Sequence, residues 1–125
     1  MSINEEAILL HKKLNGKLTT ESKMHIKSSE DLSLLYTPGV AAPCLEIKND
    51  PKTVYDYTIK ANTIAVVSDG SAVLGLGNIG PEAAMPVMEG KCVLFKEFGD
   101  VNAFPICLDT QDTDKIIETV CMIAP

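Results

Sequence analysis

The fold is decided by residues 63–84, which read TIAVVSDGSAVLGLGNIGPEAA. The β-branched apolar run that opens this stretch predicts a buried strand. Asp69-Gly70 is a strong tight-turn dipeptide, so residues 72–74 are expected to return as the partner strand of a hairpin. A glycine-rich loop follows, and a helix then begins, which we expect Pro86 to interrupt or kink. Strand, turn and helix in this order indicate a layered α/β structure.

Downstream, the sequence predicts a second strand and a final helix. Residues 104–108 are an apolar run that ends at Asp109, and this run reads as a buried strand. Asp112 is a suitable N-cap for a last helix. The apolar residues that recur at helical spacing are Ile116, Ile117, Val120, Cys121 and Ile123. This repeat predicts a helix with one apolar face.

Three helix starts precede the first strand. Asn4, followed by two glutamates, predicts a capped helix that stops near Gly16. Ser29 is also followed by two acids and predicts a short second helix, which ends before the next proline. Asp50 stands before a proline and predicts a third helix that extends through Tyr57.

The length and the element order predict one domain over residues 1–125, of the α/β class, with helices packed on a small sheet. The apolar share of 46% and the charged share of 22% are those of an ordinary globular protein. The formal net charge of −6 argues against a nucleic-acid-binding protein, which needs surplus Lys and Arg. The sequence contains no run of roughly 18 apolar residues, so we expect no membrane span.

The four cysteines form no C-x-x-C pair. They are Cys44, Cys92, Cys107 and Cys121. The sequence also begins without the basic and apolar parts of a signal peptide, so free thiols in a cytoplasmic protein are expected. Cys107 and Cys121 lie in apolar runs, which predicts that both are core residues.

Gly75, Gly77 and Gly80 match the dinucleotide-binding pattern G-x-G-x-x-G. Asp100 follows about twenty residues later, as that fingerprint requires. In this interpretation, backbone N–H groups at a helix N-terminus hold a pyrophosphate. The short lead-in strand and Pro86 both weaken it. A glycine-rich turn that lets chain segments pass closely is therefore the preferred interpretation.

Four motifs in a fixed order resemble those of the bacterial-type malic enzymes. They are YTPGVAAPC at 36–44, VSDGSAVLGLGNIG at 67–80, PVMEGK at 86–91 and FPICLD at 104–109. The resemblance covers nearly the whole chain and rests on several ordered motifs, so it is more specific than any one of them. It implies that residues 1–125 are the N-terminal domain of such an enzyme, without the Rossmann cofactor domain.

The resemblance implies oxidative decarboxylation of malate to pyruvate and carbon dioxide, with NAD or NADP and a divalent metal, Mg²⁺ or Mn²⁺. By the same resemblance, Tyr36 of the Tyr-Thr-Pro motif is the general acid. Lys91 of the Gly-Lys motif is the general base and contacts the substrate. In this family the glycine-rich block is not the nucleotide site, which argues against Gly75, Gly77 and Gly80 as pyrophosphate ligands.

In this family the metal ligands and the nucleotide-binding domain lie C-terminal to the point where this sequence stops. We therefore expect the chain to be a piece of a longer protein and to be inactive alone. No metal or cofactor ligand is assigned to any residue of the chain. Asp69 and Asp109 are acidic and lie near glycines or strand ends, but turn or cap roles are the stronger interpretation for both.

The two catalytic roles suit the residue types. Oxidation of malate needs a base for the hydroxyl proton, and the later enolate needs an acid at C3. A lysine has an ordinary pKa of about 10.4, so it acts as a base near neutrality only when burial or a nearby positive charge lowers that pKa. The apolar residues after Lys91 favour burial, although most lysines are simply exposed. Tyr36 stands beside a Pro-Gly turn, a rigid platform for a proton-donating phenol, but a packed aromatic residue is the plain alternative.

The small-subunit branch of this family forms dimers, so the resemblance implies a homodimer in which Tyr36 reaches the active site of the partner. Two rival interpretations stay open. One is a non-catalytic assembly module that supplies only subunit contacts, and the other is a small nucleotide-binding domain that uses Gly75–Gly80. The choice between NAD and NADP, the identity of the metal, and a related malolactic reaction also stay open.

Overall fold

The computed structural model describes residues 2–125, which form two compact units. Unit 1 contains the chain up to Thr19 together with Ile64–Pro125, and unit 2 contains Thr20–Thr63. Unit 1 carries the sheet, whereas unit 2 is built from short helices.

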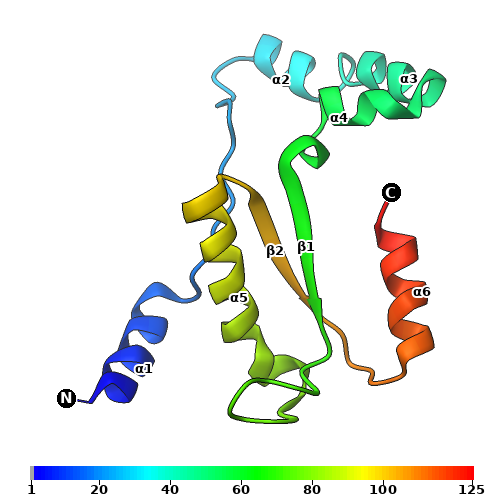
Figure 1. Cartoon of the computed structure of the whole chain (residues 1–125). Coiled ribbons are helices and arrows are strands. Elements are labelled where there is room, and N and C mark those ends of the chain that lie inside the picture. Colours follow the sequence, from blue (N-terminus) through cyan, green and yellow to red (C-terminus); the bar gives the residue numbers. More distant parts are fainter. Residues whose placement is uncertain (1) are drawn as a thin grey trace. The chain divides into compact units, whose positions relative to one another are not determined.

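Unit 1 is built around a two-stranded parallel sheet (Figure 1). Strand β1 (Thr63–Ser68) begins at the boundary with unit 2, and β2 (Asn102–Cys107) pairs with it. Helix α5 (Gly80–Gly99) connects the two strands and packs against β2. Helices α1 (Ile3–Leu14) and α6 (Thr113–Ile123) complete the unit. The predicted α/β class is confirmed, together with both strands, the helix between them and the Asp112 cap of α6.

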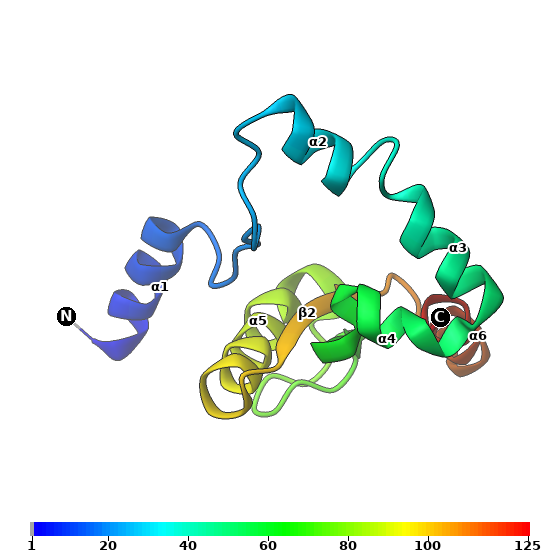
Figure 2. The same cartoon turned by 90° about the horizontal axis from the view of Figure 1, so that it is seen from above.

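The core of unit 1 lies along one face of α5. Ala84, Met88 and Cys92 are spaced by four residues and are the buried hydrophobic side chains of residues 2–125. Positions four apart lie on the same face of a helix, so this face is the one that packs on the sheet. Figure 2 shows α5 lying against β2. The packed face fixes the direction in which every other side chain of α5 points.

Helix α5 runs through Pro86 without a break, so of the two outcomes expected for Pro86, an interruption or a kink, the interruption is wrong. Proline has no N–H group, and its ring crowds the carbonyl four residues earlier, so the Glu82 carbonyl loses its helical hydrogen bond. Buried Ala84 and Met88 flank the proline and anchor the helix on both sides of it. Their burial outweighs the one bond that is lost.

The loop after β1 does not return as a strand, so the predicted hairpin is wrong. Residues 72–74 contribute only an isolated antiparallel bridge, between Val73 and Gly77, and β1 pairs with β2 instead. Gly75, Gly77 and Gly80 have φ angles between +75° and +78°. These left-handed conformations turn the chain where a strand would extend it.

The ends of this loop are held together at Gly70. The Ile79 N–H donates to the Gly70 carbonyl at 3.0 Å. Gly70 has a φ of +72°, and a Cβ atom there would overlap the carbonyl of Gly80. Glycine is therefore required at position 70 both for the backbone conformation and for the close approach.

Replacing Gly70 with alanine is expected to lower the free energy of unfolding by about 3 kcal/mol, because left-handed strain adds to displacement of the Gly80 carbonyl. Gly75→Ala is the matched control, since Gly75 has a φ of +78° but open space around its Cβ position. The control should lose only the strain contribution, about 1 kcal/mol. Urea unfolding measures both losses. Equal losses would show that the Gly70–Gly80 contact contributes nothing.

Unit 2 contains short helical segments joined by tight turns. They are α2 (Ser29–Leu35), α3 (Ala41–Asn49), the 3-10 turn η1 (Pro51–Thr53), α4 (Val54–Tyr57) and the 3-10 turn η2 (Ile59–Asn62). The predicted start at Asp50 is confirmed, because its carboxylate accepts from the Lys52 N–H at 3.1 Å and caps η1. Helix α3 was not predicted. Pro43 concealed it, although proline is tolerated in the first turn of a helix, where its missing N–H leaves no helical bond unmade.

Two predicted helix starts are off by one or two residues. Helix α1 is capped by Ser2 instead of Asn4: the Glu5 N–H donates to Ser2 Oγ at 3.3 Å, and the Ser2 N–H donates to the Glu5 carboxylate at 2.7 Å. Helix α2 is capped by Ser28, one residue before Ser29. In both helices the cap used is the one with an acid three positions later, since that acid can bond back to the start of the helix.

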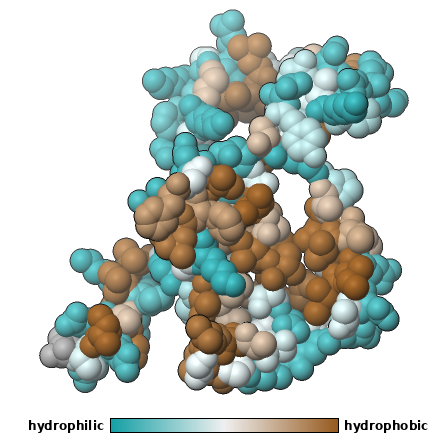
Figure 3. Space-filling view, in the orientation of Figure 1, coloured by the Kyte–Doolittle hydropathy of each residue, from teal (hydrophilic) through white to brown (hydrophobic). Residues whose placement is uncertain are grey.

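Apolar side chains remain exposed on unit 1 (Figure 3). Along α6 the exposed apolar residues are Ile117, Val120, Met122 and Ile123. The predicted apolar repeat of this helix is therefore present, but within unit 1 it stays uncovered. None of the helices in residues 2–125 combines the length and the hydropathy needed to cross a membrane.

All four cysteines are free thiols. Burial raises the pKa of the Cys92 thiol, and the Glu89 carboxylate adds to this rise. Cys92 is therefore a protonated packing group near neutral pH. Cys107 is half-buried on β2, whereas Cys121 is exposed on α6, so the predicted core position of Cys121 is wrong. It lies on a helix whose apolar face is uncovered.

Candidate functional site

Tyr36 follows the end of α2, in a turn that backbone hydrogen bonds hold in place. Its N–H donates to the Leu32 carbonyl at 2.9 Å, and its carbonyl accepts from the Val40 N–H at 2.7 Å. The Gly39 N–H donates to the Ser33 carbonyl at 2.8 Å. The Tyr36 side chain is 65% exposed. The turn therefore presents the phenol at the surface of unit 2 from a fixed backbone.

The local sequence explains this turn. A residue that precedes proline is disfavoured in helical geometry, so α2 ends before Thr37-Pro38, as predicted. Gly39 then passes so close to α2 that a Cβ atom there would overlap the Ser33 carbonyl. The glycine is required by this close approach, which brings the chain back beside α2, directly after which Tyr36 lies.

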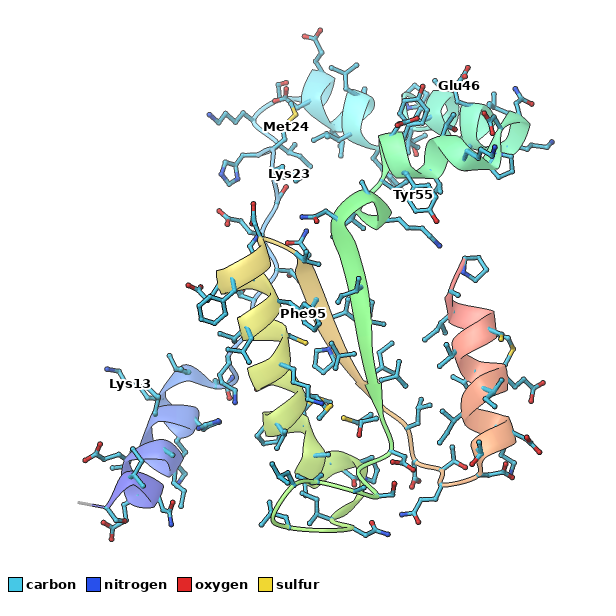
Figure 4. The ribbon with its side chains drawn as sticks, viewed as in Figure 1. Lys13, Lys23, Met24, Glu46, Tyr55 and Phe95 are labelled. Atoms are coloured by element: carbon cyan, nitrogen blue, oxygen red, sulfur yellow. The ribbon has the colours of Figure 1, made fainter. Side chains whose placement is uncertain are left out.

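Lys91 lies in the middle of α5 and is exposed. It lines a groove together with Leu94, Phe95, Phe98 and Gly99. Figure 4 labels Phe95 on the C-terminal half of this helix, and Phe98 is 86% exposed. The ammonium group thus stands at one end of an exposed apolar helix face. The burial that the sequence predicted for this lysine is not provided by unit 1.

The two predicted catalytic residues are held by different units. Tyr36 belongs to unit 2 and is fixed by the bonds of its turn. Lys91 belongs to unit 1, and its neighbour Cys92 is fully buried, so the packed face of α5 fixes the backbone that carries Lys91. Each residue has a rigid attachment in its own unit, which is what positioned acid–base groups need. Their roles stay predictions.

The glycine motif uses its N–H groups within its own loop. The N–H groups of Leu76 and Gly77 both donate to the Val73 carbonyl, at 2.9 and 2.8 Å. The Ile79 N–H donates to the Gly70 carbonyl. In the dinucleotide fingerprint the N–H groups of the glycine loop face a pyrophosphate, whereas here those of Leu76, Gly77 and Ile79 are bonded within the loop. The geometry favours the turn interpretation over the nucleotide-binding one.

Asp100 also differs from the acidic residue of the dinucleotide fingerprint. It adopts a left-handed φ of 49° and ends helix α5. Its carboxylate accepts from Lys96 Nζ at 2.6 Å, and this hydrogen bond and charge lower the pKa of Asp100. The side chain therefore has a local role at a helix end.

Acidic side chains form no metal site in the part of the chain that the structure describes. The Asp69 carboxylate accepts from the Ser71 N–H at 2.9 Å and from Ser71 Oγ at 2.7 Å, and these bonds lower the pKa of Asp69. This is the turn role that the sequence favours for it. Across residues 2–125, no three His, Cys, Asp or Glu side chains are grouped as metal ligands. The described residues alone therefore supply no set of three ligands for a divalent metal ion.

One arrangement had no signal in the sequence. Lys17 and Glu89 are 72 positions apart, yet the Lys17 N–H donates to the Glu89 carboxylate at 3.3 Å. The Lys17 ammonium donates to the Pro86 carbonyl at 2.6 Å. Periodicity and motifs report local spacing, so a contact between such distant segments becomes visible only in the fold.

A family model described as malic enzyme, N-terminal domain, matches residues 15–123. The chain is similar to the bifunctional malic/malolactic enzyme of Bacillus subtilis, with 62% identity over 125 residues, which are 100% of this chain and 30% of that protein. The NAD-dependent malic enzyme of Geobacillus stearothermophilus is 58% identical over 125 residues, 100% of this chain and 26% of that protein. The NADP-dependent malic enzyme of Escherichia coli is 52% identical over 110 residues, 88% of this chain and 14% of that protein.

The crystal structure of a malic enzyme from Pyrococcus horikoshii is similar to this chain, with a TM-score of 0.96 at 55% identity. The likeness covers 99% of this chain and 29% of that chain. The chain thus spans less than a third of the length of each of these proteins. The segment matched by the family model contains both Tyr36 and Lys91.

Proposed function

The chain belongs to the malic enzyme family, and from this premise we propose that it supplies two acid–base residues to an enzyme that oxidises and decarboxylates malate. The observation that carries the proposal is the match of residues 15–123 to the N-terminal domain of that family. In this proposal residues 1–125 form the domain for substrate binding and dimerisation. The chain alone, without the rest of the enzyme, is inactive.

The proposed chemistry assigns one proton transfer to each residue. Lys91 takes the proton of the C2 hydroxyl as malate is oxidised to a keto acid. Carbon dioxide then leaves, and the remaining enolate receives a proton at C3 from Tyr36, which gives pyruvate. The hydride from C2 leaves with NAD or NADP. Lys91 then holds one proton more and Tyr36 one proton fewer than at the start, so a proton passes from Lys91 to Tyr36 before the next turnover.

The surroundings of both residues support these roles. Tyr36 is exposed on a turn fixed by backbone bonds, so its hydroxyl is available to a substrate. Lys91 is exposed beside an apolar groove, and a surface that covers this groove would remove water from the ammonium group. Such desolvation favours the neutral form of a lysine, which is the form that acts as a base.

We assign NAD or NADP, and Mg²⁺ or Mn²⁺, to the complete enzyme and not to residues of this chain. The relatives named for NAD and for NADP support a nicotinamide cofactor. We propose that the ligands for both groups lie C-terminal to the residues of this chain. The four free thiols further support a cytoplasmic location, where thiols stay reduced.

We also propose that the enzyme is a homodimer in which Tyr36 works in the active site of the partner. The uncovered apolar residues of α6 and of the α5 groove support subunit contacts, because large exposed apolar areas mark protein interfaces. The same observation favours the second candidate function, a non-catalytic assembly module. Turnover measurements separate the two.

The test uses a joined protein, in which this chain replaces the matching segment of the Bacillus subtilis malic/malolactic enzyme. The protein is supplied with malate, Mg²⁺ or Mn²⁺, and either NAD or NADP. Production of pyruvate with reduction of one nucleotide is the expected result. Lactate without net reduction would instead assign the malolactic reaction. Formation of neither pyruvate nor lactate, with the joined protein folded and the parent enzyme active, would favour the assembly module.

A further inference from the structure

A short segment after α1, Asn15–Lys17, contacts the side of α5. We name this segment the strap. Asn15 ends α1 in a left-handed conformation, and Gly16, with a φ of +100°, brings the chain against Glu89. A Cβ atom at Gly16 would lie 3.1 Å from Glu89 Oε1, so glycine lets the backbone approach this closely. The half-buried Lys17 follows directly.

Lys17 binds α5 at two points. Its N–H donates to the Glu89 carboxylate at 3.3 Å, and its ammonium donates to the Pro86 carbonyl at 2.6 Å. The second bond is short and carries a charge, and bonds of that kind are the stronger ones in proteins. The ammonium also lies 3.7 Å from the Cβ position of Gly90, next to Lys91. The strap therefore contacts the turn of α5 that leads into Lys91.

The strap contacts α5 at Pro86, the residue that cannot donate a helical hydrogen bond. Pro86 removes a helical hydrogen bond and crowds the preceding turn, which favours bending of a helix at that place. Helix α1 lies at the same position, because Ala7, Ile8, His11 and Lys12 line a groove together with Pro86. The helix is thus supported from outside where its own hydrogen bonding is interrupted.

The strap and Lys91 lie on different sides of α5. At 100° per residue, Pro86 and Glu89 project on the side of the helix opposite Lys91. The sheet holds a third side through Met88 and Cys92. The strap and the sheet thus hold α5 on two sides. The remaining side carries Lys91 and its groove; it stays exposed, and its orientation is fixed.

We propose that Lys17 is a positioning residue, which holds the segment of α5 after Pro86 and thereby sets the position of Lys91 for proton transfer. The inference rests on the proposed function in one respect, namely that Lys91 is the base. Misplacement of a reacting group by about 1 Å costs up to about 100-fold in rate, so a helix that bends at Pro86 would reduce turnover without removing any substrate contact.

The experiment compares Lys17→Met, Lys17→Arg and Lys13→Met in the joined protein. Methionine keeps the unbranched shape and most of the length of the side chain but cannot donate to the Pro86 carbonyl, whereas arginine can. Lys13, labelled in Figure 4 at the end of α1, is an exposed matched control. Two quantities are measured: amide hydrogen exchange of residues 87–94, and kcat with KM for malate.

Lys17→Met is expected to speed exchange in residues 87–94 by about tenfold, the value of one charged hydrogen bond. It should lower kcat by about tenfold with KM nearly unchanged, since Lys17 contacts no substrate. Lys17→Arg should restore most of both quantities, and Lys13→Met should change neither.

Unchanged exchange in Lys17→Met would overturn the inference, whatever the kinetics. Faster exchange with unchanged kcat would also overturn it, provided that Lys91→Ala is inactive in the same protein. If Lys91→Ala keeps full turnover, the proposed function fails instead, and exchange alone decides whether the strap holds α5. The two failures are therefore distinguishable.

Discussion

Replacing Lys91 with alanine in the joined protein is expected to lower kcat for malate oxidation by about 10³- to 10⁴-fold, the upper range for loss of a general base. The expected loss is large because no other lysine lines the groove beside the apolar face of α5. Folding should be kept, since the Lys91 side chain is exposed and the core residues of α5 are untouched. Steady-state kinetics, with circular dichroism and sedimentation as checks on fold and assembly, measure the effect.

Lys96→Ala is the matched control for this variant. Lys96 lies on the same helix, five positions further on, and pairs with Asp100 in an exposed ion pair. Such pairs contribute at most about 1 kcal/mol to stability, so this variant should keep near-wild-type turnover. Similar kcat values for Lys91→Ala and the unaltered protein would contradict the assignment of the base and would favour the assembly module.

Tyr36→Phe is expected to lower kcat by about 10²- to 10³-fold, because the substitution removes one hydroxyl that donates the proton to C3. Stability should change little, since the ring is 65% exposed and the turn is held by backbone bonds that phenylalanine keeps. Tyr57→Phe, on α4 and 53% exposed, is the matched control. Accumulation of the enolate or its slow release by Tyr36→Phe would be the kinetic sign of a missing acid.

Mixing the two inactive variants tests whether Tyr36 acts in the partner. If each site combines Lys91 of one chain with Tyr36 of the other, a mixed dimer of Lys91→Ala and Tyr36→Phe has one intact site. Random exchange of subunits should then restore about a quarter of the wild-type rate. If both residues of a site come from one chain, no mixed dimer has an intact site, and the mixture stays inactive.

Sequence reasoning found the elements whose signals are local. Only neighbouring residues are needed to recognise the β-branched run of β1, the Asp50 and Asp112 caps, and the start of α5 after the glycine loop. The two catalytic assignments came from ordered motifs, not from geometry.

The errors arose where distant contacts decide the outcome. The hairpin prediction is wrong because β1 pairs with β2. Strand β2 begins 34 residues after β1 ends. The predicted interruption at Pro86 does not occur because buried side chains on both sides of the proline hold the helix together. The strap at Lys17 had no sequence pattern at all. Tertiary packing overrode local preference in each case.

The close approach of Gly70 to Gly80 determines where extra residues can be inserted in this loop. The two ends of the loop are joined by the Ile79–Gly70 bond, and the tip residue Leu74 is fully exposed. Insertions at the tip therefore leave the anchor points where they are, and doubling the loop length costs only about 0.6 kcal/mol of closure entropy. A short peptide inserted at Leu74 is therefore expected to leave β1 and α5 in register.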